Sequence, residues 1–422
     1  MSPLRRAAGR TFASLTSPNL RRYFAGLTIS QVGSWVQLVA LPWLVLKITD
    51  DGTMLGLTYA MQFLPILVLG AWGGVIADRH DKRRVLLLTT TLLGVLAAVL
   101  GTLTLLDRVQ LWSILVIAVL LGTVAAFDNP TRRSFVPELV EPEQVANAVS
   151  LNNAVFTAAR IVGPSIAGIL IATIGIGWCF IVNAASFVAV IVVLVRMDPA
   201  TIQSAPPLAR ARGQLRDGIR YAWNAPLVRL AILTTFVIGV LSFNYQVVLP
   251  LLAERTFATG PTGYALMFAA TGIGALGGAL TSAHRGRVTA RGLGLAAVTF
   301  GCTMATAALA PGLVIELVVL VPMGAAGMVF FSLANAAVQE RVDPAVRGRV
   351  TALFSVAFLG STPIGSPIVG AVSEHLGARA GLAIGAAAAV GTGIVALVTL
   401  PARPARVTAA PLGDPPTPRL SA

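Results

Sequence analysis

The stretch that decides the fold is GGVIADRHDKRR, Gly73 to Arg84, which lies between LTYAMQFLPILVLGAW (57–72) and VLLLTTTLLGVLAAVL (85–100). Ionisable residues follow one another without a break from Asp78 to Arg84, whereas neither flanking tract carries a charge. A helix needs about 20 apolar residues to cross the hydrocarbon core of a bilayer. The pattern therefore predicts two membrane-spanning helices joined by a short charged loop at the membrane surface.

The composition of the whole chain indicates a membrane protein. Its 422 residues are 56% hydrophobic and 11% charged, with a mean hydropathy of +0.81, whereas soluble domains carry about 25% charged residues. Cys179 and Cys302 lie inside apolar tracts, which indicates neither a disulfide framework nor a thiolate metal site. We expect no metal, no cofactor and no catalytic site. The first 22 residues are basic and lack the apolar centre of a signal peptide.

The hydrophobic pattern predicts an all-α membrane protein with twelve transmembrane helices. The predicted spans are Gln31–Ile48, Leu55–Ala77, Val85–Leu106, Leu111–Phe127, Ala146–Ile174, Trp178–Val195, Leu227–Leu251, Tyr264–Ala283, Leu293–Ala310, Leu313–Val338, Val350–Val372 and Leu382–Leu400. Lys and Arg gather on the cytoplasmic side of membrane proteins. With both termini on that side of the inner membrane, only Lys47, Arg108, Arg255 and Arg379 fall in outer loops, and Arg160 lies within a span. This topology accounts for the net charge of +14 without a nucleic-acid partner.

The chain also repeats itself. Val136–Leu170, VPELVEPEQVANAVSLNNAVFTAARIVGPSIAGIL, aligns without a gap on Val338–Val372, VQERVDPAVRGRVTALFSVAFLGSTPIGSPIVGAV. The repeat predicts two pseudo-symmetric six-helix halves, an arrangement typical of transporters. The expected organisation is an amino-terminal segment (1–22), a first half (23–196), a cytoplasmic linker (197–226), a second half (227–400) and a cytoplasmic tail (401–422).

The stretch GGVIADRHDKRRVL resembles the loop signature of the major facilitator superfamily, with Gly74, Asp78, Arg79 and Arg83 in the expected places. Asp81 departs from the glycine that is usual there, so the turn is expected to be tighter or differently capped. The stretches NLRRYFAGLTISQVGSWVQLVALPWLVLKIT, AAFDNPTRRSFVPELV and ARIVGPSIAG are similar to the exporter branch that contains siderophore exporters and macrolide efflux proteins. The resemblance implies export by alternating access, driven by a proton gradient, in a protein that works as a monomer.

The resemblance implies that the charged loop is a gate. In the family, the aspartate equivalent to Asp78 latches the two halves in the outward-facing state, and the partner helix here would begin near Val350. Asp128, at the inner end of the fourth helix, is a candidate to hold Arg79 or Arg83 in the same network. Positive charges at this loop have a second explanation, because they also satisfy the cytoplasmic bias and can meet anionic lipid head groups.

Arg160 is the most informative residue within a span, because a charge near mid-depth costs at least about 2.5 kcal/mol on insertion scales. Two interpretations are open. One is a structural arginine bonded to backbone carbonyls or a nearby Asn; the other is a cation in the transport cavity that binds anionic substrate or tunes a proton site. The GPSIAG stretch that follows, with Gly163, Pro164 and Gly168, resembles a fifth-helix motif of antiporters and predicts a bent, closely packed helix.

Two departures from the drug-antiporter pattern concern coupling. Those antiporters commonly carry an arginine four residues before a glycine in the fourth helix, where this chain has Ala118 before Gly122. The chain also places no Asp or Glu at mid-span, since Asp128 and Glu340 fall at inner ends and Glu316 and Glu374 near outer ends. Proton coupling is therefore implied by the resemblance alone.

Polar and aromatic residues inside the spans predict the walls of a substrate cavity. A cluster this polar does not suit a lipid-facing surface, although each member could instead bond a neighbouring helix. The candidates are Gln31, Ser34 and Gln37 in the first span, Gln62 in the second, Asn152 and Asn153 in the fifth, and Asn244, Tyr245 and Gln246 in the seventh. Sparse charge at mid-depth favours a large amphipathic or apolar small molecule, such as a drug, macrolide or siderophore, over a small charged metabolite.

Other functions are weighed against export. GIGALG, Gly272 to Gly277, satisfies the dinucleotide-binding pattern, but it lies inside a predicted span without a preceding strand, so helix packing is the better explanation. Within transport, the alternatives are an importer of small metabolites and a lipid or lysophospholipid flippase. A membrane scaffold without transport activity is the third class, and the repeat, the charged loop and Arg160 argue against it.

Overall fold

The computed structural model describes residues 13–203, 214–282, 288–343 and 346–399, all of them in helices, turns and connecting segments. The amino-terminal residues 1–12, residues 204–213 of the predicted linker and the predicted tail 401–422 lie outside the described residues. The first long helix begins at Pro18, inside the predicted amino-terminal segment, because the Ser17 side chain caps it and proline is favoured in a first turn.

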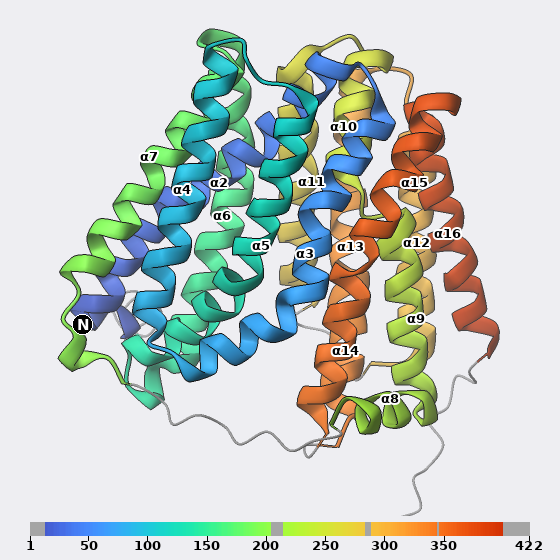
Figure 1. Ribbon diagram of the computed structural model, residues 1–422. Coiled ribbons are helices and arrows are strands. Elements are labelled where there is room, and N and C mark those ends of the chain that lie inside the picture. The colour runs from blue at the N-terminus through green and yellow to red at the C-terminus, as the bar shows by residue number, and fades with distance from the viewer. Residues whose placement is uncertain (1–12, 204–213, 283–287, 344–345, 400–422) are drawn as a thin grey trace, which may run out of the picture.

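The fold-class prediction is confirmed by a bundle of long helices (Figure 1). The amino-terminal half contains α2 (Pro18–Thr49), α3 (Gly52–Arg79), α4 (Lys82–Leu105), α5 (Leu111–Phe135), α6 (Val145–Thr173) and α7 (Ile176–Arg196). The helix α8 (Gln214–Asn224) lies within the predicted linker, and the carboxy-terminal half contains α9 (Pro226–Leu241), α10 (Tyr245–Leu251), α11 (Gly260–Ser282), α12 (Ala290–Ala308), α13 (Leu313–Arg341), α14 (Arg347–Leu359), α15 (Ser361–Leu376) and α16 (Ala378–Thr399). Short turns fill the connections: η1 (Ala13–Thr16), η2 (Val136–Leu139), η3 (Pro142–Gln144), η4 (Pro199–Thr201) and the π-helical η5 (Leu252–Thr256).

Within the described ranges, 11 helical segments are long and apolar enough to cross a membrane. The remaining predicted span, Leu293–Ala310, corresponds to α12, which packs against α13 and α16 and leaves its other face exposed. Two predicted spans are broken in the middle. The seventh separates into α9 and α10 at Ser242–Asn244, and the eleventh separates into α14 and α15 at Gly360.

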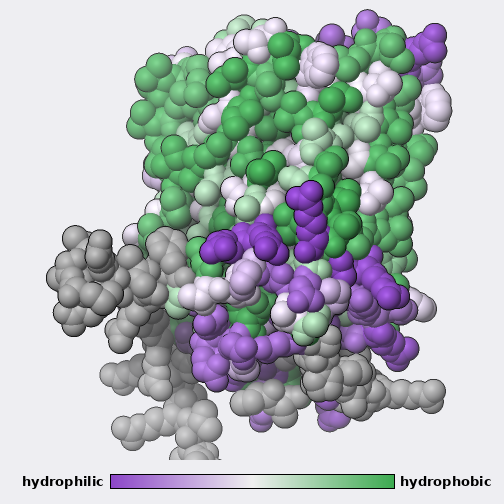
Figure 2. Space-filling view, turned by 90° about the vertical axis from the view of Figure 1, so that its left-hand side faces the viewer, coloured by the Kyte–Doolittle hydropathy of each residue, from purple (hydrophilic) through white to green (hydrophobic). Residues whose placement is uncertain are grey.

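Polar residues divide between the two ends of the bundle. Figure 2 shows hydrophilic residues gathered below a broad hydrophobic band, as expected for a protein that meets a bilayer around its waist. We call the end that carries Arg79, Lys82, Arg83, Arg196 and Arg229 the basic face, and the end that carries the loops before Gly52, Gly260 and Ala378 the opposite face.

The two halves pack together most closely toward the opposite face. There α3 lies along α15, and α6 lies along α11. A Cβ at Gly56 would overlap the backbone of Ser366, so only glycine allows this approach of α3 to α15. In Figure 1 the helices of the two halves stand farther apart at the basic face than at the opposite face.

The loop between α3 and α4 shows how the departure at Asp81 is accommodated. Asp81 has a negative φ of −57° and caps α4, because its carboxylate accepts a hydrogen bond from the Arg84 backbone at 3.2 Å. A side chain that caps a helix amino terminus replaces the flexibility that glycine would give. The expectation of a differently capped turn is confirmed.

Candidate functional site

Arg160 lies where the two halves meet. Its guanidinium carbon is 5.9 Å from the centre of the Trp35 ring on α2, which is the range of a cation–π interaction. Tyr245, at the start of α10, is close enough to Arg160 for the two side chains to interact electrostatically. Arg160 therefore lies over an aromatic ring of its own half and within electrostatic range of a phenol of the other half.

The backbone of Arg160 also forms part of the contact between the halves. Pro164 stands four residues later and has no N–H, so the Arg160 carbonyl lacks its ordinary helical partner. On α11, a Cβ built at Gly272 would lie 3.6 Å from that carbonyl oxygen. The carbonyl that Pro164 leaves without its helical partner thus faces the first glycine of GIGALG across the interface. The interpretation of GIGALG as a helix-packing stretch is confirmed, because it lies within α11 and Gly274 packs on the backbone of Val321.

Aromatic rings surround this position. Trp35 lies edge-on to Phe156 of α6 at 5.7 Å and close to Phe268 of α11 at 5.9 Å, measured between ring centres. Phe268 in turn contacts Tyr264 at 6.0 Å. The glycine at 163 makes room for this cluster, because a Cβ there would overlap the Trp35 side chain. The rings offer a flat apolar surface that suits an amphipathic molecule better than a small charged one.

Several buried polar atoms near the interface have no hydrogen-bond partner among the described residues. They are Gln62 Oε1, Arg160 Nε, Tyr245 OH and Tyr264 OH. Buried polar groups are nearly always hydrogen-bonded in native proteins, and one that is not calls for an explanation. Donors and acceptors held open beside an aromatic cluster are the arrangement that a ligand site requires.

The other predicted cavity residues are placed differently. The Gln37 amide oxygen accepts a hydrogen bond from Asn183 Nδ2 on α7 at 2.7 Å, and the Asn244 amide oxygen accepts one from Ser366 Oγ on α15 at 2.9 Å. Both side chains therefore bond a neighbouring helix, which is the alternative that the sequence left open. Of the remaining candidates, Ser34 bonds the Ser30 carbonyl of its own helix, Gln31, Asn152 and Gln246 are half-buried, and Asn153 is exposed.

The charged loop joins elements of the amino-terminal half. Lys82 Nζ lies 2.6 Å from Glu138 Oε1 of η2, and both side chains are largely buried. Arg83 donates from Nε to the Leu194 carbonyl at 2.6 Å, close to the carboxyl end of α7. A cation near the last carbonyls of a helix also meets the negative end of the helix dipole. Asp78 is half-buried in the last turn of α3, and Arg79 is exposed.

The predicted partner of Asp128 is wrong. Asp128 pairs with Arg132 of its own helix α5, with Nε to Oδ2 at 2.9 Å and Nη2 to Oδ1 at 3.0 Å, instead of with Arg79 or Arg83. Thr89 of α4 completes the site by donating to Asp128 Oδ1 at 2.8 Å. The i,i+4 spacing brings the two side chains together without any tertiary requirement. The close approach of α3 to α5 is made by Gly73, beside the predicted Gly74, because a Cβ at Gly73 would overlap the Ala126 carbonyl.

A polar network on the opposite face joins the halves. Glu374, near the end of α15, accepts from the Gly52 backbone N–H at 2.6 Å and from Arg255 Nη1 at 2.8 Å. Arg255 Nη2 also donates to the Asp50 carbonyl at 2.5 Å. We call Asp50, Gly52, Arg255 and Glu374 the opposite-face network. The sequence analysis placed two of these residues in or near outer loops without connecting them.

Comparison with known proteins gives matches along almost the whole chain. Residues 9–419 match the family described as transmembrane secretion effector. The multidrug efflux pump Tap of Mycolicibacterium fortuitum is 29% identical over 374 residues, covering 86% of this chain and 91% of the pump. The enterobactin exporter EntS of Escherichia coli is 26% identical, with 86% of each chain covered. The staphyloferrin A transporter of Staphylococcus aureus is 28% identical over 56% of this chain, and the match spans 59% of that relative.

Solved structures share the fold. A bacterial homologue of the iron transporter ferroportin, in an inward-facing state, has a TM-score of 0.73 at 16% identity, with 94% of this chain and 99% of that chain covered. The D-xylose–proton symporter has a TM-score of 0.70 at 14% identity, with 92% and 98% covered. At these identities the likeness shows the architecture alone.

Proposed function

Because the chain belongs to the transmembrane secretion effector family, a branch of the major facilitator superfamily, we propose that it exports an amphipathic or apolar small molecule by alternating access. The curated relatives that match most of its length are an efflux pump and a siderophore exporter, which favours export over the importer and flippase alternatives. A drug, a macrolide or a siderophore is the substrate class proposed for this chain.

The observation that carries the proposal is the position of Arg160. Its buried Nε has no hydrogen-bond partner among the described residues, and its guanidinium lies over the Trp35 ring and within electrostatic range of Tyr245. Holding a cation with an unpaired buried donor at this depth is costly unless a ligand uses it. We infer that Arg160 binds an electron-rich group of the substrate while the aromatic cluster packs against its apolar part.

The orientation, the driving force and the oligomeric state are parts of the same proposal. The positive-inside bias favours the basic face as the cytoplasmic side of the inner membrane. A proton gradient is the proposed driving force, supported by the family resemblance. The monomer is the proposed working unit. With the basic face inside, the arrangement in Figure 1 corresponds to a transporter closed toward the exterior.

The test is transport into inside-out vesicles with and without an imposed proton gradient, using a panel of fluorescent and macrolide-type compounds. Arg160→Ala is expected to abolish gradient-dependent accumulation, and Arg160→Lys to retain a fraction of it, because lysine keeps the charge but not the planar guanidinium. Arg108→Ala, in an exposed loop of the opposite face, is the matched control and should transport normally. Normal transport by folded Arg160→Ala would refute the assigned role.

A further inference from the structure

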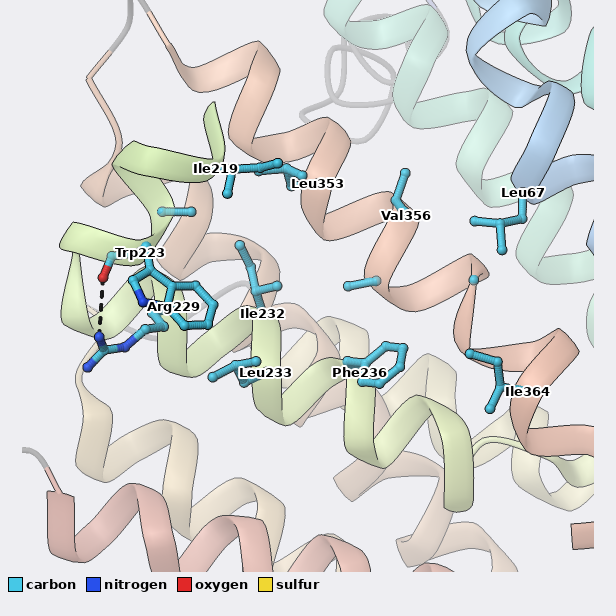
Figure 3. Close-up of a pocket in the computed structure, with 13 residues that line it drawn as sticks. Leu67, Ile219, Trp223, Arg229, Ile232, Leu233, Phe236, Leu353, Val356 and Ile364 are labelled. Carbon is cyan, nitrogen blue, oxygen red and sulfur yellow. Dashed lines mark hydrogen bonds between the residues drawn. The ribbon is translucent and has the colours of Figure 1, made fainter. Parts of the chain in front are cut away.

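An apolar groove opens on the lipid-facing side of the carboxy-terminal half. Figure 3 shows it between α8, α9, α14 and α15, with Leu67 of α3 at its far end. Its volume is about 380 Å³, and among the described side chains Arg229 is the one charged residue that lines it. The lining residues that matter here are Ala222, Trp223, Arg229, Leu233, Val356 and Ala357.

The groove belongs to the surface that meets hydrocarbon. Leu233 and Val356, on its two sides, are 45% and 53% exposed, and both sit in helices long and apolar enough to cross the membrane. Apolar side chains exposed at this depth are covered by lipid chains in a bilayer. A concave apolar surface there is suited to one acyl chain, because flexible methylene groups can follow its shape.

The rim of the groove has a different chemistry. Arg229 lies at the amino-terminal end of α9, where α8 and α9 meet on the basic face. Its guanidinium carbon is 5.9 Å from the Trp223 ring centre, and its Nη1 donates to the Trp223 carbonyl at 3.3 Å. These two contacts hold an exposed cation beside an exposed indole, and no other donor of the guanidinium bonds a described residue. Trp and Arg side chains together are typical of the level of lipid head groups.

We propose that this groove binds one anionic phospholipid, with an acyl chain along the apolar wall and the phosphate at Arg229. The positive charge of Arg229 at the rim favours an anionic head group. The apolar wall from Leu233 to Val356 favours a molecule with an acyl chain over a soluble anion. Since α9 and α14 form opposite walls, a bound lipid links the segment before the α14–α15 break to the first helix of the carboxy-terminal bundle. The site is separate from Arg160 and does not depend on the identity of the exported compound.

The experiment measures quenching of Trp223 fluorescence in proteoliposomes that contain brominated phosphatidylglycerol or brominated phosphatidylcholine. The Trp223 contribution is obtained by subtracting the signal of Trp223→Phe from that of the unmodified protein. We expect phosphatidylglycerol to bind about fivefold more tightly than phosphatidylcholine, as one basic residue near an anionic surface gives. Arg229→Gln should remove this preference, and Arg196→Gln, an exposed arginine on α7 of the same face, should preserve it.

A second variant tests the apolar wall. Ala357→Phe places a ring in the groove and should reduce Trp223 quenching by both brominated lipids. Arg229 and Trp223 at the rim are unaltered in this variant. Equal quenching by the two lipids in the unmodified protein would overturn the anionic specificity. Full quenching in Ala357→Phe would overturn the placement of the chain. Loss of quenching on adding a transported compound, at constant lipid, would overturn the proposal by identifying the groove as a substrate site.

Discussion

We expect Glu374→Gln to weaken the closure of the opposite face. Glu374 accepts two hydrogen bonds, from Gly52 at 2.6 Å and from Arg255 at 2.8 Å, and both would remain possible to a neutral amide oxygen. A hydrogen bond to a charged group contributes about 1.5–3 kcal/mol, against about 0.5–1.5 kcal/mol for a neutral pair. The charge is therefore worth about 1 kcal/mol per bond.

Screening by solvent lowers the contribution of the Glu374 charge only in part. The Glu374 and Arg255 side chains are 23% and 29% exposed, so the Glu374 charge should contribute roughly 1–2 kcal/mol to the closed arrangement through the two bonds together. Since about 1.4 kcal/mol corresponds to a factor of ten, the population open at the opposite face should rise roughly five- to thirtyfold. Asp50→Asn is the matched control, because the Asp50 side chain is 86% exposed and Arg255 also bonds its backbone carbonyl. That variant should shift the population by less than about threefold.

The assay is the distribution of distances between two spin labels on the opposite face, measured by double electron–electron resonance. Labels at Asp107→Cys and Leu309→Cys report one half each, in a background with the native cysteines replaced by alanine. Glu374→Gln should add a longer distance that the unmodified protein populates weakly. Identical distributions for Glu374→Gln and the unmodified protein, or a larger effect of Asp50→Asn, would refute the assignment of the network as a latch.

Three further predictions concern packing and the charged loop. Gly274→Ala should lower the unfolding temperature in detergent by several degrees, because its Cβ would overlap a backbone carbonyl, whereas Gly277→Ala, with open space at that position, should be neutral or stabilising by up to about 1 kcal/mol. Lys82→Met should destabilise the protein by about 3–5 kcal/mol, because it removes one partner of a largely buried ion pair, and adding Glu138→Gln should recover part of that loss in the same unfolding measurement. Asp78→Asn should change the accessibility of cysteine probes on the two faces, and unaltered accessibility would argue against the gate.

The fold could be predicted because a bilayer constrains the sequence at every span. Three independent features indicate the same topology: the long apolar tracts, the uneven distribution of Lys and Arg between the two sides, and the internal repeat. The breaks within the spans were harder to predict from the sequence. The polar cluster at Asn244 coincides with the break between α9 and α10, but the eleventh span reads as continuous through Gly360, and the equivalent helix α6 is unbroken. Glycine alone does not distinguish close packing from a break.

The part of the site that could be predicted is the part that depends only on the depth of a residue in the membrane. Arg160 stands out because a charge at mid-span is costly, and the structure places it beside Trp35 and Tyr245. Partners could not be assigned in the same way. The sequence offers several cations as partners for Asp128, and only the structure identifies Arg132 as the partner. The bond between Arg255 and Glu374 joins residues 119 positions apart, and nothing local to either one indicates the other.

In the proposed mechanism, substrate binding and the change of access meet at Arg160. The side chain of Arg160 faces the aromatic cluster, while its carbonyl, freed by Pro164, lies against Gly272 of the other half. A ligand shifts a conformational equilibrium only by its difference in affinity for the two arrangements. Because separating α6 from α11 would displace both the ligand contact and the carbonyl contact, a substrate held by Arg160 necessarily has such a difference. To open the opposite face, that difference must exceed the roughly 1–2 kcal/mol contributed there by the Glu374 charge. A substrate bound by the aromatic cluster alone, without Arg160, would lack this difference in affinity between the two arrangements. Such a substrate should bind without being transported.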